Sequence, residues 1–381
     1  MKLEMISSAN LDGQSNQELL QFFSSFHIQG LMELKYDRKS DFFGLYKTQG
    51  KDFRTYFLRD QPSGKIAASA SFVIREVRYA NETVKIAYAT DLRVSNSRRA
   101  ILEWSQHFLP TLEAIKADLK VNHFFSVIDM GERTILNAFL RPRTMRRNLP
   151  RYFLYRKFNI NSLHGRFPWA PTPLQSLRIR EGNSSNLEAL VDYLTRKSKY
   201  RPFCSVWDQN SLEQKISRLP GFKLSDFLIA FDNQEKVIGC LAPWSPQSVQ
   251  KLIPFSFDGP ADNFRQFLKF GRLFGWTHPL TKPVSSSGTE APLNFRWLSH
   301  LAVDNEDIFE SLLWKAYERL NRQEFLAYTQ IDQDFRINPP KSWIAAQQPH
   351  ALYSMTAPAE DRPSYVHPSE TLNPEIEGIF I

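Results

Sequence analysis

Ionisable side chains recur in the same order in the two halves of the sequence, about two hundred residues apart. Asp91 and His300 each stand near the end of a strand-like segment that leads into a helical pattern, and Tyr155 and Tyr353 stand in later strand-like segments. Carboxylate and imidazole groups can act as general bases, and a phenol can act as a general acid. Asp91, His300 and Tyr155 are therefore candidate catalytic residues. The alternatives are that Asp91 pairs with a nearby arginine, that His300 is hydrogen-bonded at a domain face, and that Tyr155 is a core or rim residue.

Two arginines, Arg98 and Arg99, precede the small residue Ala100 where the helical pattern of the first half begins. A helix start presents free N–H groups and the positive end of the helix dipole, which together bind anions such as phosphate. The alternative is that both arginines flank the helix start and point to solvent.

The matching stretch of the second half, residues 304–307, reads Asp-Asn-Glu-Asp. Acids at a helix start stabilise that helix by about 0.3–1 kcal/mol each, and Asp304 or Asn305 is a good N-cap. The same charges would repel a phosphate. The sequence therefore predicts an anion site in the first half and none of the usual kind in the second.

The net charge of +8 is unevenly distributed. Residues 1–170 contain 26 Lys and Arg against 16 Asp and Glu, whereas residues 171–381 contain 22 against 24. No acidic residue occurs from Arg133 to Arg180, and the densest basic cluster is 141–147. Such asymmetry points to an anionic partner: a phosphorylated cofactor, an acidic carrier protein, a lipid headgroup surface or nucleic acid. A solvated basic face is the alternative.

Length and composition exclude several classes of protein. A chain of 381 residues with 42% hydrophobic content has room for two or three domains with real cores. No apolar run approaches the ~20 residues that cross a bilayer, and the first residues lack a signal-peptide core. Two cysteines make neither a disulfide framework nor a complete metal site, so we expect a cytoplasmic protein without a metal. Walker-type, Gly-x-Gly-x-x-Gly, His-Glu-x-x-His and Gly-x-Ser-x-Gly motifs are absent.

Apolar periodicity predicts an ordered series of elements in each half. A stripe of apolar residues over 101–115 indicates a helix, which Pro110 should kink or interrupt. The expected strands of the first half are 31–36, 54–59, 65–79, 84–94, 124–128 and 151–158. Those of the second half are 176–180, 226–232, 236–241, 295–303, 325–331 and 351–356. Because the order repeats, we interpret the chain as an internal duplication.

The boundaries follow from these elements. We expect an N-terminal lead-in over 1–25, a first domain over 26–160 and a linker over 161–175. A second domain covers 176–356 and contains an insertion over 243–292. Residues 357–381, with four prolines and several acids, form a C-terminal tail.

Several antiparallel strands followed by strand–helix–strand–helix–strand, with residues 91–94 ending a strand just before a helix, resemble the GNAT (GCN5-related N-acetyltransferase) superfamily. The resemblance covers about residues 25–158 and 176–356. It implies an α/β (α+β) fold of two GNAT-like domains in tandem. Each would be a mixed, largely antiparallel twisted sheet with a splayed central strand pair and helices on both faces.

The resemblance also implies roles for residues. In GNAT proteins the splayed strand pairs with the pantetheine arm of an acyl-CoA, and the following loop and helix start cradle the pyrophosphate. The matching positions here are Leu92, Arg93, Val94, Arg98, Arg99 and Ala100. The glycines of the usual Arg/Gln-x-x-Gly-x-Gly/Ala pattern are missing. Asp91 or His300 would remove the proton of an amine, and Tyr155 would protonate the leaving thiolate.

The function so implied is acyl transfer from acyl-CoA or an acyl carrier protein to a small-molecule amine, with the donor in the first domain. The alternative is a non-catalytic tandem GNAT-like protein that binds a small molecule, lipid or protein. The basic region 133–157 can meet an acyl carrier protein or an anionic membrane surface. Nucleic acid is not favoured, because no nucleic-acid fold signature accompanies these basic residues. The basic, Phe-rich helix expected over 262–274 should cover the acceptor side or line the groove between the domains; a membrane-surface helix is the alternative.

Overall fold

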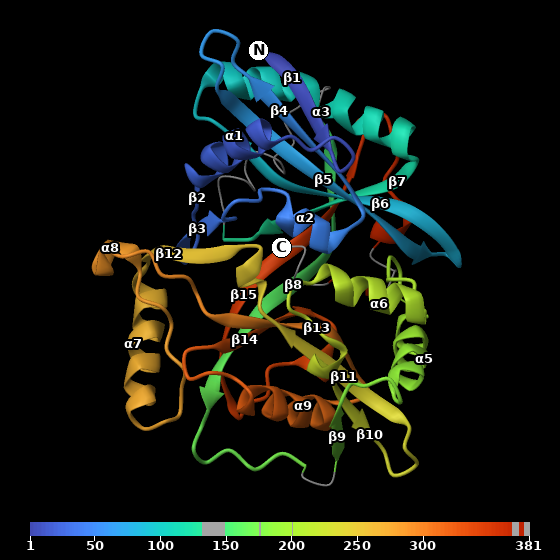
Figure 1. Ribbon diagram of the computed structural model, residues 1–381, viewed down its shortest axis with the longest axis vertical. Helices are drawn as coiled ribbons and strands as arrows, with labels where there is room; N and C mark the ends of the chain where they lie inside the picture. The colour runs from blue at the N-terminus through green and yellow to red at the C-terminus, as the bar shows by residue number, and fades with distance from the viewer. Residues whose placement is uncertain (132–148, 175–176, 200, 368–372, 377–381) are drawn as a thin grey trace.

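Apolar runs of the chain fold into strands that join into one large sheet, drawn from top to bottom in Figure 1. The computed structural model describes residues 1–131, 149–174, 177–199, 201–367 and 373–376. Within them the large sheet has twelve strands, in the order β1-β4-β5-β6-β7-β15-β8-β14-β13-β11-β10-β9. The first half of the chain supplies the upper part of the sheet in Figure 1 and the second half supplies the lower part.

The strands of the first half are β1 (Lys2–Ser7), β4 (Asp52–Arg59), β5 (Ile66–Tyr79), β6 (Glu82–Val94) and β7 (Val121–Asp129). The two central strands are β8 (Arg151–Arg166) and β15 (Trp343–Thr356). The second half contributes β9 (Arg178–Glu181), β10 (Leu228–Phe231), β11 (Val237–Trp244), β13 (Phe295–Val303) and β14 (Phe325–Ile331). Each half contains one parallel pair, β6–β7 and β13–β14, whereas the other pairs are antiparallel.

The central strands β8 and β15 differ from the expectation. The sequence assigned 151–158 to the first half and 351–356 to the second. Residues 350–355 of β15 in fact pair with β7 of the first half, and residues 158–163 of β8 pair with β14 of the second. The two halves therefore exchange their closing strands. The division at residues 160 and 161 stays a prediction, and the continuous strand β8 crosses it, so that residues 161–166 of the expected linker are strand.

Most of the helices lie on the faces of the large sheet, and the two helices of the insertion over 243–292 lie beside a strand of that insertion. The helices are α1 (Gly13–Ser24), α2 (Gly44–Gln49), α3 (Arg98–Leu119), α5 (Leu187–Ser198), α6 (Gln209–Arg218), α7 (Gly259–Leu273), α8 (Val284–Ser287) and α9 (Glu306–Glu318). Helix α3 continues through Pro110, so the expected interruption does not occur, and a kink at this residue stays a prediction. Pro110 is exposed, so the N–H that it lacks belongs to the solvent side of the helix. The sequence also predicts a short helix over 134–140, which lies outside the described residues.

The insertion over 243–292 ties the halves together. It contains β12 (Lys251–Phe257), α7 and α8, and β12 pairs with β3 (Met32–Asp37) of the first half. With β2 (His27–Ile28) they make a separate three-stranded sheet.

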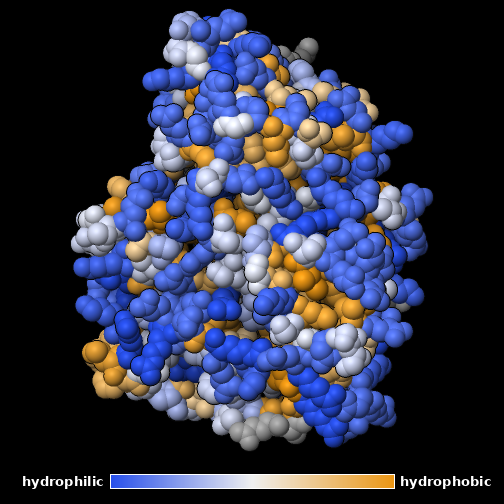
Figure 2. All heavy atoms as spheres, in the orientation of Figure 1, coloured by the Kyte–Doolittle hydropathy of each residue, from blue (hydrophilic) through white to orange (hydrophobic). Residues whose placement is uncertain are grey.

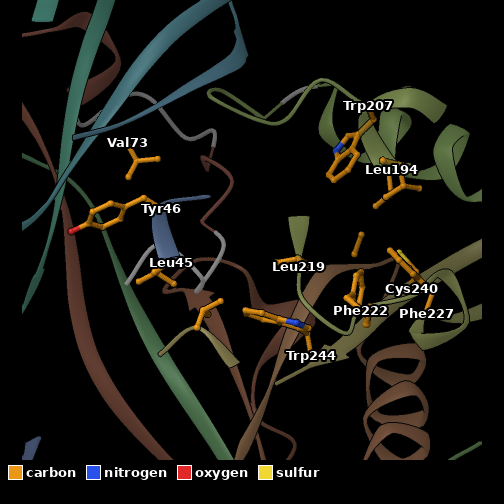
Figure 3. Packing of buried hydrophobic residues seen from close by; sticks show 14 of the residues in the cluster. Leu45, Tyr46, Val73, Leu194, Trp207, Leu219, Phe222, Phe227, Cys240 and Trp244 are labelled. Carbon is orange, nitrogen blue, oxygen red and sulfur yellow. The ribbon is translucent and has the colours of Figure 1, made fainter. Parts of the chain in front are cut away.

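The largest hydrophobic core also draws on both halves. Figure 3 shows part of it, with Tyr46 and Val73 from the first half and Trp207 and Trp244 from the second. Because these buried side chains share one core, neither half buries its apolar surface alone.

Candidate functional site

A β-bulge interrupts the central strand of each half at corresponding places. In β6, Asp91 and Leu92 together oppose the one residue between Ser69 and Ser71 of β5. In β13, His300 and Leu301 do the same against β11. Such bulges bend and twist a strand at the position of the extra residue.

Beyond the bulges the parallel strands separate. The pairing of β6 with β7 ends at Ala89 and Ser126, and that of β13 with β14 ends at Trp297 and Ala327. The backbone of β6 after Ala89 therefore has no strand partner on its β7 side. A gap of this kind exposes peptide N–H and C=O groups to a ligand.

A cavity of about 600 Å³ begins in the gap between β6 and β7 and continues toward the second half. Apolar side chains make up much of its wall, among them Leu34, Phe108, Trp244, Phe264, Phe295 and Phe325. The polar residues of the wall include Tyr36, Arg93, Asp129, His164, Gln250 and His350. This combination of volume, apolar wall and a few polar groups is typical of a small-molecule site.

Asp91 lines this cavity but is held by an ion pair. Its Oδ2 accepts hydrogen bonds from Arg38 Nη2 at 2.6 Å and from the Tyr46 hydroxyl at 2.5 Å. The side chains of Arg38 and Asp91 are only 1% and 7% exposed. Burial alone would lower the pKa of Arg38, but the charges of Asp91 and Tyr46 outweigh it and raise that pKa. This geometry matches the alternative of an aspartate paired with an arginine.

Arg38 was not foreseen from the sequence. Its guanidinium also donates from Nε to Gln250 Oε1 at 2.8 Å and lies 4.6 Å from the ring centre of Phe23. It therefore joins the bulge of β6 to residues far along the chain. No local pattern around residue 38 marks it as buried.

The expected donor-binding residues fall into two groups. Leu92, Arg93 and Val94 line the cavity along the unpaired edge of β6. Arg98 and Arg99 are exposed at the start of α3, where Ser97 is the N-cap, and Ala100 is buried. Arg99 lies 3.7 Å from Asp60. The structure thus brings the strand edge at residues 92–94 to the cavity, whereas Arg98 and Arg99 lie at the following helix start and are not among the wall residues.

His300 and Tyr155 lie elsewhere. His300 lines a separate cavity of about 80 Å³ in the second half, where the rings of Trp207 and Phe227 pack against it. Tyr155 packs with Phe125 and other rings and does not line the large cavity. Burial raises the pKa of the Tyr155 hydroxyl. The three expected catalytic residues therefore do not form one site.

The gap between β13 and β14 is filled from within the chain. Residues Pro374, Glu375 and Ile376 line the small cavity, and the Thr329 hydroxyl donates to the Ile376 carbonyl at 2.6 Å. The start of α9 is capped by Asn305, which accepts from the Ile308 N–H at 3.0 Å. In the second half, residues 374–376 thus lie beside the strand gap, and Asn305 caps the helix start.

The sequence reasoning also missed polar residues on the large cavity's wall. His350 lies opposite Asp129 in the β7–β15 pair, and its Nδ1 donates to the Gln348 carbonyl at 3.0 Å. Gln348 Nε2 donates to Asp129 Oδ2 at 2.7 Å. Burial lowers the pKa of His350, and the charge of Asp129 partly offsets this effect. The sequence could have pointed to Asp129, Gln348 and His350 as a group only if the pairing of β7 with β15 had been known.

Among the described residues, no group of three His, Cys, Asp or Glu side chains is placed to hold a metal ion. No described helix is long and apolar enough to span a membrane.

No model of a known protein family matches the sequence, and a search of curated proteins gives no match. Solved structures do resemble the chain. Saccharomyces cerevisiae N-myristoyltransferase with bound myristoyl-CoA aligns at TM-score 0.51 and 9% identity, over 92% of this chain and 82% of that one. The glucosamine N-acetyltransferase region of a fungal multi-domain β-N-acetylglucosaminidase aligns at TM-score 0.53 and 12% identity, over 93% of this chain and 38% of that one. The chain has the GNAT fold, as expected.

Proposed function

We propose that the protein transfers an acyl group from acyl-CoA or an acyl carrier protein to an amine acceptor, with the donor bound by the first half. The large cavity that starts in the gap between β6 and β7 is the observation that carries this proposal. Its apolar wall suits an acyl chain, and the unpaired edge at residues 92–94 suits an extended amide-containing arm.

The charged part of the donor would lie at the start of α3. The first N–H groups of this helix have no partner within the helix, and Arg98 and Arg99 add two positive charges. The second half offers no such site, because Asp304, Glu306 and Asp307 surround the start of α9. These differences support donor binding in the first half.

The chemistry needs a group that takes a proton from the amine. We propose His350, because its Nδ1–H is committed to the Gln348 carbonyl and its Nε2 keeps the lone pair. The ammonium would give one proton to His350, and the neutral amine would then form a C–N bond with the thioester carbonyl carbon. The C–S bond would break, and the leaving thiolate would take up the second proton that the nitrogen releases as the amide forms. Asp91, held by Arg38, would fix the bulge instead of acting as a base.

The matching bulges of β6 and β13, together with the repeated strand order, also support an internal duplication, which we propose as the origin of the two halves. We further propose a cytoplasmic setting. An acyl carrier protein would meet the basic region 133–157, of which residues 133–148 lie outside the described part of the chain.

Calorimetry with acetyl-CoA and a long-chain acyl-CoA tests the donor site. Replacing Arg98 and Arg99 by alanine removes charge-assisted contacts worth roughly 1.5–3 kcal/mol each when dry and less when exposed, so we expect binding about tenfold weaker or worse. Added salt should weaken wild-type binding as well. The double variant Arg178→Ala/Arg180→Ala removes two exposed arginines from β9, whose ion pairs with Glu235 are remote from the cavity, and should bind as wild type.

Binding of acyl-CoA without transfer to any amine would favour the non-catalytic alternative. The absence of glycine from residues 94–101 also supports that alternative. If neither acyl-CoA nor a carrier protein binds, the donor assignment is wrong. A His350→Gln variant that binds donor normally and transfers at the wild-type rate would remove His350 from the mechanism.

A further inference from the structure

Helix α7 exposes a group of large apolar side chains. Phe267, Phe270, Leu273 and Phe274 are 43%, 57%, 80% and 55% exposed. Figure 1 places α7 at the left edge of the molecule, and Figure 2 shows an apolar patch at the lower left, over the end of this helix. A cluster of exposed phenylalanines on one helix is a mark of an interaction surface.

The cluster forms one face of a firmly held helix. Phe267, Phe270 and Phe274 follow the i, i+3, i+7 spacing of a single face, and the last two rings lie 5.1 Å apart. An adjoining side of the helix is buried through Leu268 and Gly271. The helix is therefore anchored on one side and uncovered on the other.

Thr277 provides that anchor. Its hydroxyl donates to the Leu268 carbonyl at 2.5 Å, and a Cβ added to Gly271 would lie 2.9 Å from the Thr277 side chain. Thr277 also forms a β-bridge with Gly165 of β8. The exposed face is thus presented by a rigid contact with the central sheet.

The surroundings of the apolar face are basic. Lys269 and Arg272 are exposed on the same helix, whose Arg265 is paired with Asp262. No acidic residue occurs in the sequence between Asp262 and Glu290. Apolar side chains flanked by lysine and arginine are typical of a helix that lies in the interface of an anionic membrane.

The same helix reaches the large cavity. Pro260, Ala261 and Phe264 from its first turns line that cavity, as does Leu280 shortly after it. The exposed phenylalanines and the cavity wall therefore belong to one continuous element.

We propose that α7 docks the protein on an anionic lipid bilayer, with Phe267, Phe270, Leu273 and Phe274 in the interface and Lys269 and Arg272 at the headgroups. This arrangement places the cavity beside the membrane and gives a lipophilic substrate a short path into it. A second copy of the chain is a poorer occupant, because a twofold interface on this face would bring Lys269 and Arg272 near their own copies. The docking itself does not depend on acyl transfer.

Co-sedimentation of the full chain with vesicles tests the proposal. Wild type should bind vesicles of phosphatidylcholine mixed with phosphatidylglycerol, and should bind pure phosphatidylcholine much less. The triple variant Phe267→Ser/Phe270→Ser/Phe274→Ser should lose binding by about tenfold or more, because the inserting side chains are gone. The charge reversal Lys269→Glu/Arg272→Glu should abolish binding to the anionic vesicles.

The matched control is Phe335→Ser, which removes another exposed phenylalanine (64%) that lies outside α7. It should bind vesicles as wild type. Thermal unfolding of all variants should stay near the wild-type value, since the substituted side chains are exposed. Failure of wild type to bind anionic vesicles, or equal binding by all variants, would overturn the proposal. A wild-type dimer that the triple variant dissociates would show instead that this face joins two copies. Neither result bears on acyl-CoA binding, which is measured separately.

Discussion

Asp91 and His300 occupy the same bulged position of β6 and β13, and both adopt the left-handed backbone conformation, with φ of 54° and 53°. Non-glycine residues rarely adopt this conformation, and it costs of order 1–3 kcal/mol unless the surroundings enforce it. The ion pair with Arg38 holds Asp91 in this conformation, and contacts with aromatic rings such as Trp207 hold His300. The same backbone conformation thus occurs in both halves. Among the described residues, Asp91 lines the large cavity and His300 lines the small one.

The Arg38–Asp91 pair should be essential for stability. Asp91→Ala leaves the guanidinium buried and unpaired, which costs about 3–5 kcal/mol. Urea unfolding would measure this loss. The double variant Arg38→Met/Asp91→Asn removes both charges and should recover part of it, because no buried charge is left alone. A double variant that is as unstable as the sum of its singles would contradict a direct coupling.

The C-terminal residues should stabilise the second half without blocking a donor site. Deleting residues 373–381 removes the hydrogen bond from Thr329 to Ile376 and one from Arg156 to Asn373. We expect a loss of about 1–3 kcal/mol in the free energy of unfolding. The number of acyl-CoA molecules bound per chain should not change, because the acids at the start of α9 still repel phosphate. A second bound acyl-CoA after the deletion would show that the tail masks a working site.

Neutralising the acids at the start of α9 tests whether they affect stability, donor binding or both. The triple variant Asp304→Asn/Glu306→Gln/Asp307→Asn should leave donor affinity unchanged. It should cost about 1–2 kcal/mol of stability through the weakened helix start and the lost contact of Asp304 with Lys197. Calorimetry and chemical unfolding on the same preparation give both numbers. Altered donor binding in this variant would mean that the roles of the halves are reversed.

The cavity volume should limit acyl chain length. Ala346 of β15 lines the cavity and is half-buried, so Ala346→Leu places three more carbons inside it. We expect a long-chain acyl-CoA to bind about tenfold more weakly or worse, while acetyl-CoA binds as before. The short-chain donor is the internal control for folding and for the phosphate contacts. Equal weakening of both donors would place the chain outside this cavity.

Local sequence patterns predicted single helices and strands, but not how the strands pair. The apolar stripe of α3 and the strand patterns of β6 and β13 are complete within about twenty residues, so local sequence alone identifies them. The pairing of β7 with β15 joins residues more than two hundred positions apart, such as Asp129 and His350. Nothing in either segment specifies that partner, so the strand exchange could not be predicted.

The assignment of site residues stays a prediction, and the sequence pointed to only part of the cavity wall for the same reason. Residues 92–94 and Arg98–Arg99 follow one another along the chain. The structure places residues 92–94 on the cavity wall and Arg98 and Arg99 at the start of α3. Arg38, His164 and His350 reach the bulge or the cavity wall from three other segments. Polar residues from separate segments can be recognised as one site only when the fold is known.

Buried histidines should make the protein sensitive to acid. Burial lowers the pKa of His164 to about 3 and that of His123 to about 4. The unfolded chain binds these protons below its ordinary histidine pKa of about 6.5, whereas the folded protein does not bind them until much lower pH. The contribution of each neutral histidine is therefore complete above pH 6.5 and is lost as the pH falls toward the folded value.

Lowering the pH from 6.5 to 5 should reduce the free energy of unfolding by about 2 kcal/mol through His164 alone, because each pH unit in this range contributes about 1.4 kcal/mol. Urea unfolding at pH 7, 6 and 5 should therefore show a shallower pH dependence for His164→Leu than for wild type. Ser162→Ala is the matched control, because it removes the 3.0 Å hydrogen bond between the Ser162 hydroxyl and His164 Nε2 but keeps the titrating ring. It should be less stable at every pH and keep the wild-type slope. If His164→Leu also keeps that slope, His164 takes up its proton in the folded protein as readily as in the unfolded chain. The prediction that His164 stays neutral in the folded protein would then be wrong.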